Sequence, residues 1–552
     1  MRQEIEDVIA KICKELFATD LSVELTRPDE QFGDYATNIS LQISKQVGQN
    51  PREIAEAIKQ KLHHQYIAEV TVAGPGFINI RLNDETLRIQ SEQKPSRHLA
   101  DKSVVAEYSD PNPFKVLHAG HLYTSIVGDS IAKLLETAGA NVHRVNFGGD
   151  VGLHVGKTMY VILQRLAGDN PDKLSEIQEV DRAEWLTSAY VEGTNIYDQN
   201  DDAKSAIVEL NKRVYKLHAD NDHDSPFAQI YWTTRQWSYD YFNKFYDRIG
   251  SNFERYYPES ETAALGVQTV KEHLGSVYQE SNGAIIFKGE DYGLHTRVFI
   301  NSEGLPTYEA KDVGLIMRKW EDYHFDKSIV ITGNDIVEYM KVVLKSIEQF
   351  MPDLVAATSH LTHGQVKLAG GVKMSSRKGN ILRAEDVIDA ATEANRQVTG
   401  KIDEATALAA IKYAFLKSRM GGDIIYDPDE SVALEGNSGP YLQYAHARAR
   451  SILAKAVVHE VQPTNSFDGA ERGLMSKIGQ YAEVVDRAVT ELMPHHVCTY
   501  LYELATVFNS FYEHNRVLGD EREQIRLQLV QKYADTLKSG LDLLTIPAPE
   551  RM

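Results

Sequence analysis

Two short stretches of this 552-residue chain combine residue types that bind phosphate groups. The first is His118-Ala119-Gly120-His121, placed where a loop leads into a helical pattern. The backbone N–H groups and the dipole at a helix start attract anions, and two imidazoles three residues apart can donate hydrogen bonds to the same phosphate. Gly120 lets a nucleotide approach the backbone closely. Alone, such a pair of histidines is as often structural as functional. Zinc binding is a weaker interpretation, because the sequence shows no third metal ligand beside the two histidines.

The second stretch is KMSSRKGN (373–380), which contains Lys373, Met374 and Ser375. Three cations and two hydroxyls in a loop that ends in glycine suit a triphosphate or a departing pyrophosphate. Standing alone, this stretch is better interpreted as a solvated basic loop. The two motifs together, far apart in one chain, form the two-part motif of class I aminoacyl-tRNA synthetases.

The composition narrows the class of protein further. The chain has 59 basic and 79 acidic residues, a net charge of −20, which argues against a general binder of polyanions or membrane surfaces. Its two cysteines, Cys13 and Cys498, exclude a disulfide framework and fit a reducing compartment. No apolar run approaches the ~18 residues that span a bilayer. We therefore expect a cytoplasmic protein of several domains, with no membrane partner.

The periodicity along the chain indicates which elements position the two motifs. An apolar run (104–108), a helical pattern ending at Gly139 and a second run (141–147) form a βαβ unit, which implies a parallel sheet. A polar helical insertion at about 156–255 interrupts this sheet, and the runs at 284–287, 298–300, 328–332 and 365–368 continue it. After about residue 395 only helical periodicity remains.

The predicted fold is therefore multidomain α/β plus all-α. An N-terminal α+β module occupies residues 1–90, with a helix from Pro51 to Leu62 and a Gly-Pro-Gly turn before a strand. A Rossmann-type parallel-sheet catalytic domain with its insertion occupies 103–395, and a C-terminal helical bundle occupies 396–552.

Longer segments resemble one family in particular. The stretch PNPFKVLHAGH (111–121) is similar to the form found in arginyl-tRNA synthetases, and the agreement extends to GDVGLHVGK (149–157), GLPTYEAKDVGL (304–315), EGNSGPYLQYAHARARSIL (435–453) and IPAPERM (546–552). The resemblance implies an N-terminal tRNA-binding domain and a C-terminal anticodon-binding domain. It also implies ligation of L-arginine to tRNA(Arg) by a monomer that uses ATP with Mg²⁺ and has no tightly bound cofactor.

The resemblance also nominates site residues. A guanidinium is planar and permanently charged, so its pocket needs carboxylates in fixed geometry. By similarity the arginine-binding residues are Asn112, Glu259, Tyr308 and Asp312. Structural alternatives remain, since Tyr308 could pack and Asp312 could pair with Lys311 or Arg318. The residues implied for ATP binding, with catalytic roles for the histidines and lysines, are Lys115, His118, Gly120, His121, Lys373, Met374 and Ser375.

Three positions depart from the family pattern. Asp335 is followed by Ile336 where relatives often have Gln, and His154 stands where many have Gln. Ser376 replaces the second lysine of the KMS loop, and Lys115 is thought to take over that lysine's role in this family.

On the tRNA side, single-stranded bases stack on aromatic faces for roughly 1–3 kcal/mol each. The resemblance nominates Tyr441, Tyr444, Arg448 and Met552 as tRNA-binding residues. From spacing alone these tyrosines would be interpreted as packing residues. The aromatic stretch 231–246 favours a buried helix face over an RNA surface.

Two rival functions remain. A nucleotidyltransferase with the histidine motif but without tRNA would leave both terminal regions unexplained. A synthetase-like RNA-binding or regulatory protein would be free to lose Lys115, Lys373, Glu259 and Asp312, all of which are present.

Overall fold

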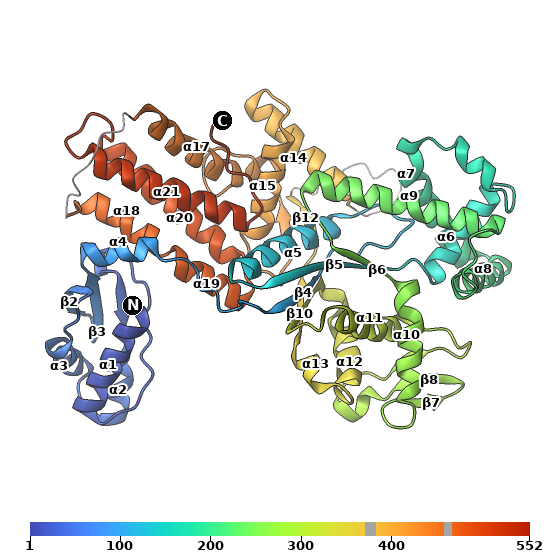
Figure 1. Cartoon of the computed structure of the whole chain (residues 1–552), viewed down its shortest axis with the longest axis horizontal. Coiled ribbons are helices and arrows are strands. Elements are labelled where there is room, and N and C mark those ends of the chain that lie inside the picture. Colours follow the sequence, from blue (N-terminus) through green and yellow to red (C-terminus); the bar gives the residue numbers. More distant parts are fainter. Residues whose placement is uncertain (370–381, 457–465) are drawn as a thin grey trace.

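The computed structural model describes residues 1–369, 382–456 and 466–552, which form three linked bodies (Figure 1). The N-terminal body is an α+β module built on an antiparallel sheet of order β1-β3-β2. The predicted Gly-Pro-Gly turn joins β2 to β3, and Ile78, Ile80 and Leu82 point into the core. Its elements are α1 (Arg2–Phe17), β1 (Tyr35–Thr37), α2 (Ile39–Val47), α3 (Pro51–Lys61), β2 (Ile67–Ala73) and β3 (Phe77–Leu82).

The central body contains a five-stranded parallel sheet of order β11-β10-β4-β5-β6, which confirms the predicted Rossmann-type architecture. The strand of this sheet that comes first in the sequence, β4, lies inside the sheet, so the later strands are added on both of its sides. The strands are β4 (Ser103–Glu107), β5 (Asn141–Gly148), β6 (Arg255–Pro258), β10 (Lys327–Gly333) and β11 (Thr358–His363).

Both faces of this sheet are covered, as expected for parallel strands. Val104 and Ala106 join the core formed with helix α5 (Ala119–Thr137), whereas Val105 joins a second core on the opposite face. Figure 1 shows α5 on one side of the sheet and α11 to α13 on the other. The helices of the second face are α10 (Glu259–Glu272), α11 (Tyr308–Tyr323), α12 (Val337–Glu348) and α13 (Pro352–Ala356).

Several predicted strands lie outside the main sheet, and this corrects the expectation from sequence. β8 (Ala284–Phe287) and β9 (Arg297–Ile300) form a separate antiparallel sheet with β7 (Gln279–Ser281). Short connections between these strands permit antiparallel pairing, whereas a parallel crossover needs a dozen or more residues.

The strand predicted at 365–368 also leaves the main sheet. It is β12 (Val366–Leu368), which pairs with β13 (Ile424–Tyr426), so the prediction of helices alone after residue 395 is wrong at β13. β11 was not predicted, because its sequence TSHLTH lacks an apolar run.

The insertion between β5 and β6 consists mainly of helices, as predicted. Its longest helix, α9, carries the aromatic stripe, and Tyr231, Trp237, Phe242 and Tyr246 on it are buried. The stripe is therefore a packing surface. The helices are α6 (Leu153–Arg165), α7 (Arg182–Gln199), α8 (Asp201–Ala219) and α9 (Pro226–Ile249).

The C-terminal body is a helical bundle, as predicted apart from β13. Phe508 and Tyr533 stack at 3.8 Å between ring centroids at the centre of its core. Its helices are α14 (Ala384–Thr399), α15 (Glu404–Leu416), α16 (Pro428–Ser431), α17 (Gly439–Lys455), α18 (Gly469–Gly479), α19 (Tyr481–Glu491), α20 (His495–His514) and α21 (Glu523–Leu543).

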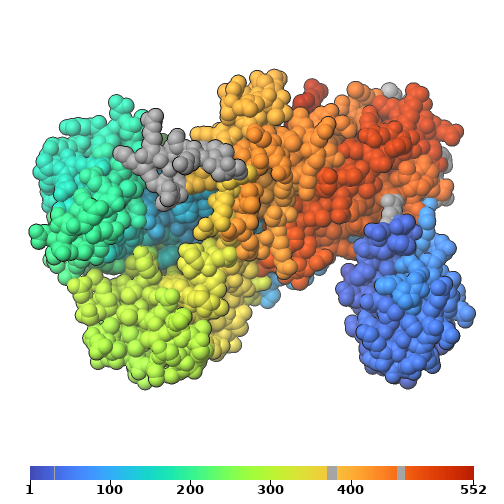
Figure 2. Space-filling view, turned by 180° about the vertical axis from the view of Figure 1, so that it is seen from behind, coloured from blue at the N-terminus to red at the C-terminus, as the bar shows by residue number. Residues whose placement is uncertain are grey.

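The N-terminal module lies against this bundle at one end of the molecule, far from the insertion (Figure 2). Helix α4 (Asp84–Glu92) packs on α18, and the buried carboxylate of Asp34 is 2.6 Å from the guanidinium of Arg472. No helix in the described part of the chain is long and apolar enough to cross a membrane.

Candidate active site and tRNA-binding surface

Two of the residues predicted to bind arginine lie where the parallel strands end. Asn112 follows β4, Gly149 follows β5 and Glu259 follows β6. The carboxyl ends of parallel strands share one edge, and ligands of such sheets bind in the crevice at that edge where the strand order reverses. Because β4 has β5 on one side and β10 on the other, the loop after β4 stands at this reversal.

The histidine motif forms the first turn of α5. His118 caps the helix by accepting the N–H of Gly120 on Nδ1 at 3.1 Å, and Nδ1 of His121 accepts the N–H of His118 at 3.1 Å. The two rings stack with centroids 3.7 Å apart. Since each Nδ1 accepts, each neutral ring carries its proton on Nε2 and retains that N–H as a donor.

Both imidazoles are held in the neutral form. Desolvation by the surrounding protein, and then Lys115, lower the pKa of His118 to about 4. Burial, and then His118 itself, lower the pKa of His121 well below its ordinary value. At neutral pH the motif therefore offers uncharged Nε2–H donors together with the partial positive charge of the helix start.

Gly120 is required by the cap itself. A Cβ at this position would lie 2.8 Å from Cε1 of the His118 ring. The glycine therefore makes room for the capping imidazole, a reason that the sequence argument from nucleotide approach did not contain.

The KMS loop (373–380), with Lys373, Met374 and Ser375, lies outside the described residues. The residues directly after it are bonded to the histidine motif. The N–H of Ala119 donates to the carbonyl of Leu382 at 2.8 Å, and the N–H of Ala384 donates to the carbonyl of Leu117 at 3.0 Å. The chain that leaves the loop is thus attached to both sides of His118.

The loop between β4 and α5 adopts a strained path. Ser109, Asp110 and Phe114 have φ values of 76°, 49° and 70°, which non-glycine residues rarely adopt. Such strain persists only where surrounding structure enforces it, and it is typical of functional loops.

Side chains of the insertion hold this loop in place. The N–H groups of Phe114, Val116 and Leu117 donate to the hydroxyls of Ser238, Thr187 and Tyr241, respectively, at 2.9, 2.9 and 3.3 Å. Between these contacts, the ammonium of Lys115 lies 4.2 Å from the centre of the Tyr190 ring on α7. The insertion therefore positions the lysine that precedes the histidines.

Of the four residues implied for arginine binding, Asn112 and Glu259 meet at Gly149. The N–H of Gly149 donates to Oδ1 of Asn112 at 2.7 Å, and a Cβ at Gly149 would lie 3.1 Å from Oε1 of Glu259. Oε2 of Glu259 is already occupied, since Nζ of Lys311 donates to it at 2.6 Å.

Tyr308 and Asp312 lie one turn apart on α11. Tyr308 is 58% exposed and therefore lies outside the core, although the ammonium of Lys311 lies 5.0 Å from the centre of its ring. Asp312 accepts the phenolic hydrogen of Tyr339, while Lys311 pairs with Glu259 and Arg318 pairs with Glu261 and other acids. The alternative in which Asp312 pairs with Lys311 or Arg318 is therefore not observed. Burial first, and then the charges of Glu107 and Glu259, raise the pKa of Asp312 to about 7.

Three polar residues of this site, Lys311, Tyr339 and Asp150, were not predicted as site residues from the sequence. Lys311 and Tyr339 contact the predicted carboxylates directly. The fully buried carboxylate of Asp150 accepts from the N–H and hydroxyl of Ser260 at 2.9 and 2.7 Å and from Arg235 at 2.9 Å, which fixes the start of α10. Asp150 belongs to the GDVG segment, so its position could have been noted, but its partners are distant in sequence.

Of the three departures from the family pattern, His154 has a bonded partner, the segment at Asp335 is bonded through its neighbour Asn334, and Ser376 lies outside the described residues. Nε2 of His154 lies 2.7 Å from the carbonyl of Gly149, next to Asn112 and Glu259, and burial lowers the pKa of His154 to about 3. Asn334, beside Asp335, donates to the carbonyl of Gly421 at 2.8 Å, which links the end of β10 to the segment before β13.

The residues implied for tRNA binding form one array on the C-terminal bundle. Asn509 donates to the Tyr441 hydroxyl at 2.7 Å and accepts from Arg448 at 3.1 Å. The Arg448 guanidinium in turn lies 4.8 Å from the centre of the Tyr444 ring, and Tyr444 is 41% exposed. Tyr441 is half-buried beside Tyr502, so it is partly a packing residue.

The end of the chain runs along the same helix. Carbonyls of Pro547 and Pro549 accept hydrogen bonds from Gln443 and His446 at 2.8 and 2.9 Å, and Met552 is 55% exposed. These bonds attach the chain end to α17, on the side of the helix opposite to Tyr444 and Arg448.

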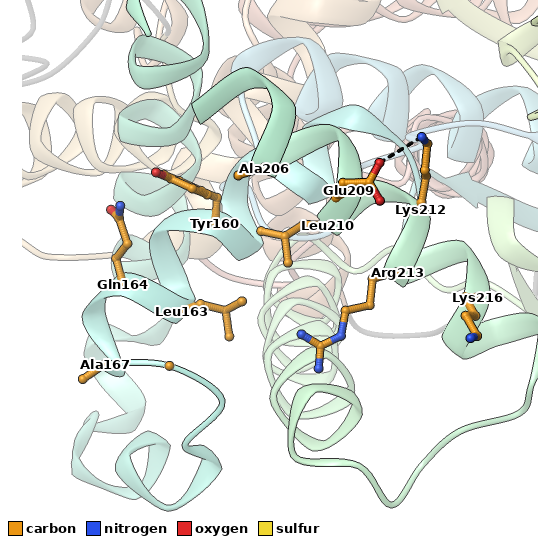
Figure 3. Close-up of a pocket in the computed structure, with 11 residues that line it drawn as sticks. Tyr160, Leu163, Gln164, Ala167, Ala206, Glu209, Leu210, Lys212, Arg213 and Lys216 are labelled. Carbon is orange, nitrogen blue, oxygen red and sulfur yellow. Dashed lines mark hydrogen bonds and ion pairs between the residues drawn. The ribbon is translucent and has the colours of Figure 1, made fainter. Parts of the chain in front are cut away.

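A hollow of about 780 Å³ lies elsewhere, between α6 and α8 of the insertion (Figure 3). None of the predicted site residues lines it. Two of its cations already have partners, since Lys212 bonds Glu209 at 3.0 Å and Arg213 bonds Asp169 at 2.6 Å. Its chemistry is therefore not that of the strand-end site, and we give it no part in the reaction.

Comparison with known proteins defines the class to which this fold and site belong. A model described as "tRNA synthetases class I (R), catalytic domain" matches residues 85–427, and a model of the DALR anticodon binding domain matches residues 442–552. The chain is a class I aminoacyl-tRNA synthetase. A third model, the arginyl tRNA synthetase N terminal domain, matches residues 1–82.

Relatives that align with nearly the whole chain are arginine–tRNA ligases, in agreement with the matched domains. An arginine–tRNA ligase of Aliivibrio salmonicida is 31% identical over 95% of this chain and 94% of its own length, and one of Parabacteroides distasonis is 27% identical over 100% of both. The chain belongs to the arginyl-tRNA synthetase family, and its reaction is the activation of arginine and the charging of tRNA. This confirms the family and function predicted from sequence.

Solved structures of similar fold include the arginyl-tRNA synthetases of Thermus thermophilus and Plasmodium falciparum. The TM-scores are 0.81 and 0.80, at 24% and 23% identity. The two alignments cover 100% of this chain and 100% and 99% of those chains. The matches to N-terminal and anticodon-binding domains also exclude the rival function of a nucleotidyltransferase that acts without tRNA.

Proposed function

We propose that the strand-end site divides its work between an ATP corner and an arginine pocket. His118, Gly120, His121 and Lys115, with Lys373, Met374 and Ser375 of the KMS loop, bind ATP, and the histidines and lysines stabilise the charge that develops on its phosphates. The observation that carries this proposal is the pair of neutral imidazoles at the start of α5, whose hydrogen bonds leave both Nε2–H groups as donors. Such preorganised donors act where transition-state charge appears.

In the first step a carboxylate oxygen of arginine forms a bond to the α-phosphorus of ATP, and the bond from that phosphorus to the bridging oxygen breaks. Pyrophosphate leaves with the electron pair. In the second step a ribose hydroxyl of the terminal adenosine of tRNA attacks the arginyl carbonyl, and AMP leaves. Positioning and charge stabilisation supply the catalysis, without a covalent enzyme intermediate.

Mg²⁺ enters as part of the substrate. No group of three His, Cys, Asp or Glu side chains in residues 1–369, 382–456 and 466–552 could hold a metal ion. Mg²⁺ is commonly bound through substrate phosphates with few protein ligands, which fits ATP delivered as its Mg²⁺ complex.

The arginine pocket uses Glu259, Tyr308 and Asp312 for the side chain and Asn112 for the α-amino or carboxylate group. Its support is that Asn112 and Glu259 meet at Gly149, that Lys311 joins Glu259 to the helix that bears Tyr308 and Asp312, and that Asp312 has no bonded basic partner among its described contacts. A guanidinium would supply that missing partner.

We further propose that tRNA(Arg) binds to Tyr441, Tyr444, Arg448 and Met552, and that the enzyme acts as a monomer in the cytoplasm. The proposed domains are 1–90, 103–395 and 396–552. The bonded array of Tyr441, Asn509, Arg448 and Tyr444 on α17 supports this surface, and the chain end is attached to the same helix.

The test compares two catalytic variants with a matched control. His121→Ala and Lys115→Ala should each lower kcat of arginylation by roughly 10²–10³, the usual cost of one preorganised donor. Lys157 lies over the Tyr197 ring at 4.4 Å, a cation–aromatic contact like that of Lys115, but it is remote from the histidines in sequence. Lys157→Ala should therefore keep wild-type kcat. Wild-type rates in Lys115→Ala would remove that residue from the ATP corner.

A further inference from the structure

A buried ion pair occupies the proposed arginine pocket. Nζ of Lys311 lies 2.6 Å from Oε2 of Glu259, and both side chains are only 4% exposed. Lys311 lies between Tyr308 and Asp312 in the sequence of α11. The start of this helix therefore provides all three side chains to the pocket. The sequence resemblance assigned roles to Tyr308 and Asp312 and none to Lys311.

The surroundings keep Lys311 charged. Its ammonium lies 5.0 Å and 5.8 Å from the centres of the Tyr308 and Tyr215 rings, whose faces attract cations. Burial alone would lower the pKa of Lys311, but Glu259 and Tyr215 outweigh burial and raise it above the ordinary value. The pocket therefore already contains a cation held by a carboxylate and two aromatic rings.

This pair sets the charge that the pocket offers to a substrate. Glu259 and Asp312 are two carboxylates, and Lys311 neutralises one of them, which leaves Asp312 to balance one incoming cation. Without Lys311 the buried Glu259 carboxyl would take up a proton at neutral pH, because an unpaired buried charge is costly, and its Oε1 would no longer be a fixed anionic acceptor for the guanidinium. The charged and titratable groups that interact with Glu259 are Lys311, Asp312 and Tyr308 from α11, Tyr339 from α12, Tyr215 from α8, and Asp150 and Lys115.

We propose that Lys311 is a positioning residue for arginine recognition, which neutralises Glu259 and fixes its carboxylate so that Oε1 faces the substrate and Asp312 alone supplies the balancing charge. The inference rests on the proposed assignment of Glu259 and Asp312 to the arginine pocket. Lys311 acts through Glu259 and not through the phosphates, so it affects arginine and not ATP.

A second buried pair on the same helix provides a matched control. Lys319 bonds Glu107 with side chains 1% and 5% exposed, and this pair ties α11 to β4. The doubly substituted Glu107→Gln/Lys319→Met chain loses a buried ion pair without a change in net charge. It reports the effect of weaker packing of α11, together with the influence that Glu107 and Lys319 have on the pKa of Asp312.

The experiment measures KM for arginine, KM for ATP and kcat of arginylation between pH 6 and 9 in four variants: Lys311→Met, Lys311→Arg, Glu259→Gln and Glu259→Gln/Lys311→Met. In Lys311→Met, KM for arginine should rise at least tenfold at pH 7, with KM for ATP unchanged. The defect should shrink as pH rises, because the unpaired Glu259 is protonated at neutral pH and regains its charge only at higher pH. Lys311→Arg keeps the charge and should retain most of the wild-type affinity.

The double variant gives the decisive comparison. Glu259→Gln alone leaves the Lys311 ammonium buried, unpaired and repelling the guanidinium, so Glu259→Gln/Lys311→Met should bind arginine better than Glu259→Gln does. Multiplicative defects would overturn the inference, because independent sites give additive free energies. The inference would also be overturned if Glu107→Gln/Lys319→Met showed the same pH-dependent rise in KM for arginine as Lys311→Met.

Failure of the underlying assignment has a different outcome. If Glu259→Gln alone leaves KM for arginine at the wild-type value, Glu259 does not belong to the pocket, and the proposed arginine site is wrong. Circular dichroism and thermal unfolding of each variant separate both outcomes from a loss of folding.

Discussion

In the proposed ATP corner, the imidazoles of the histidine motif act through hydrogen bonds rather than charge. Each Nδ1 accepts a backbone N–H, so the proton of the neutral ring is on Nε2, and the pKa of His118 is lowered to about 4. Protonation of His118 would therefore begin only in acid well below neutral pH. Any loss of activity near neutrality must have another source.

Asp312 separates recognition of arginine from catalysis. Asp312→Asn preserves the shape and the acceptor for Tyr339 but removes the charge opposite the guanidinium. A buried charge-assisted pair that loses one partner costs several kcal/mol, and each 1.4 kcal/mol is about tenfold in affinity. KM for arginine should rise by roughly a hundredfold or more, and KM for ATP should barely change.

Citrulline, which is isosteric with arginine but neutral, should be rejected by the wild type and should lose far less on this substitution. Both KM values are measured in one preparation, with circular dichroism as the folding control. If the two constants rise together, Asp312 supports the fold or the ATP corner instead.

The same residue predicts the pH dependence of arginine binding. The pKa of Asp312 is raised to about 7 in the empty pocket, mainly by burial, and a guanidinium binds the ionised form. As pH falls below 7 the neutral acid predominates, so KM for arginine should rise by about tenfold per pH unit, whereas above 7 it should level off. In Asp312→Asn this dependence should disappear. A wild-type KM that is constant from pH 5.5 to 8.5 would contradict the assignment.

The sequence indicates which residues belong to the proposed site better than it predicts which side chains they contact. The motif around His118 forms the expected helix start because its spacing and its helical context are local properties. The pairing of Glu259 with Lys311 rather than with a substrate group depends on β6 and α11 meeting in space, and no local pattern records that contact. Asp312 similarly receives its hydrogen bond from Tyr339 on another helix.

At the scale of elements, the insertion serves as a support for the catalytic loop. Three hydroxyls from α7 and α9 bond consecutive parts of the strained 114–117 segment. The loop leaves β4 in conformations with positive φ, which it would not keep without such contacts.

Loss of these hydroxyls should slow the reaction. Thr187→Val/Ser238→Ala leaves the N–H groups of Val116 and Phe114 without partners, and an unsatisfied buried donor costs about 1–3 kcal/mol. We expect kcat of arginylation to fall at least tenfold because Lys115 and His118 lose their fixed positions. The control is Gln236→Ala, which removes an exposed hydrogen bond on the same α9 helix. Equal kcat in the two variants would show that the insertion does not position the loop.

The elements that sequence patterns missed share a physical feature. β8 and β9 are apolar runs like the strands of the main sheet, but short connections place them in a local antiparallel sheet. β11 is a strand with mostly polar residues because it lies at an edge of the sheet. β13 has three residues and exists through its pairing with β12, a tertiary contact. Helices, whose periodicity is local, were predicted more completely.

At the scale of the whole molecule, the end of the chain connects the proposed anticodon surface to the catalytic helix. The hydroxyl of Ser130 on α5 donates to the carbonyl of Leu543 at the end of α21 at 2.8 Å, and Lys412 donates to the carbonyl of Thr545 at 3.0 Å. From there the chain continues along α17, where Gln443 and His446 bond the carbonyls of Pro547 and Pro549. The helix that begins with the histidine motif is thus bonded to the segment that ends at Met552.

This connection bears on when arginine is activated. The arginyl family resembles the glutamyl and glutaminyl enzymes in needing tRNA before it forms the adenylate, and we expect arginine-dependent ATP–pyrophosphate exchange here only when cognate tRNA is present. tRNA bound at α17 would favour the competent arrangement of the active site, and such coupling between sites amounts typically to 1–3 kcal/mol, or about 5–150-fold. Robust exchange without tRNA would contradict the expectation.

Ser130→Ala tests whether the contact between α5 and α21 carries this coupling. The substitution should lower tRNA-stimulated exchange several-fold while tRNA affinity stays unchanged. The exposed Ser175→Ala, a hydroxyl that bonds only the nearby carbonyl of Asp172 among its described contacts, serves as the control. If Ser130→Ala weakens tRNA binding and leaves stimulation intact at saturating tRNA, the contact between α5 and α21 stabilises the bundle and does not carry the coupling.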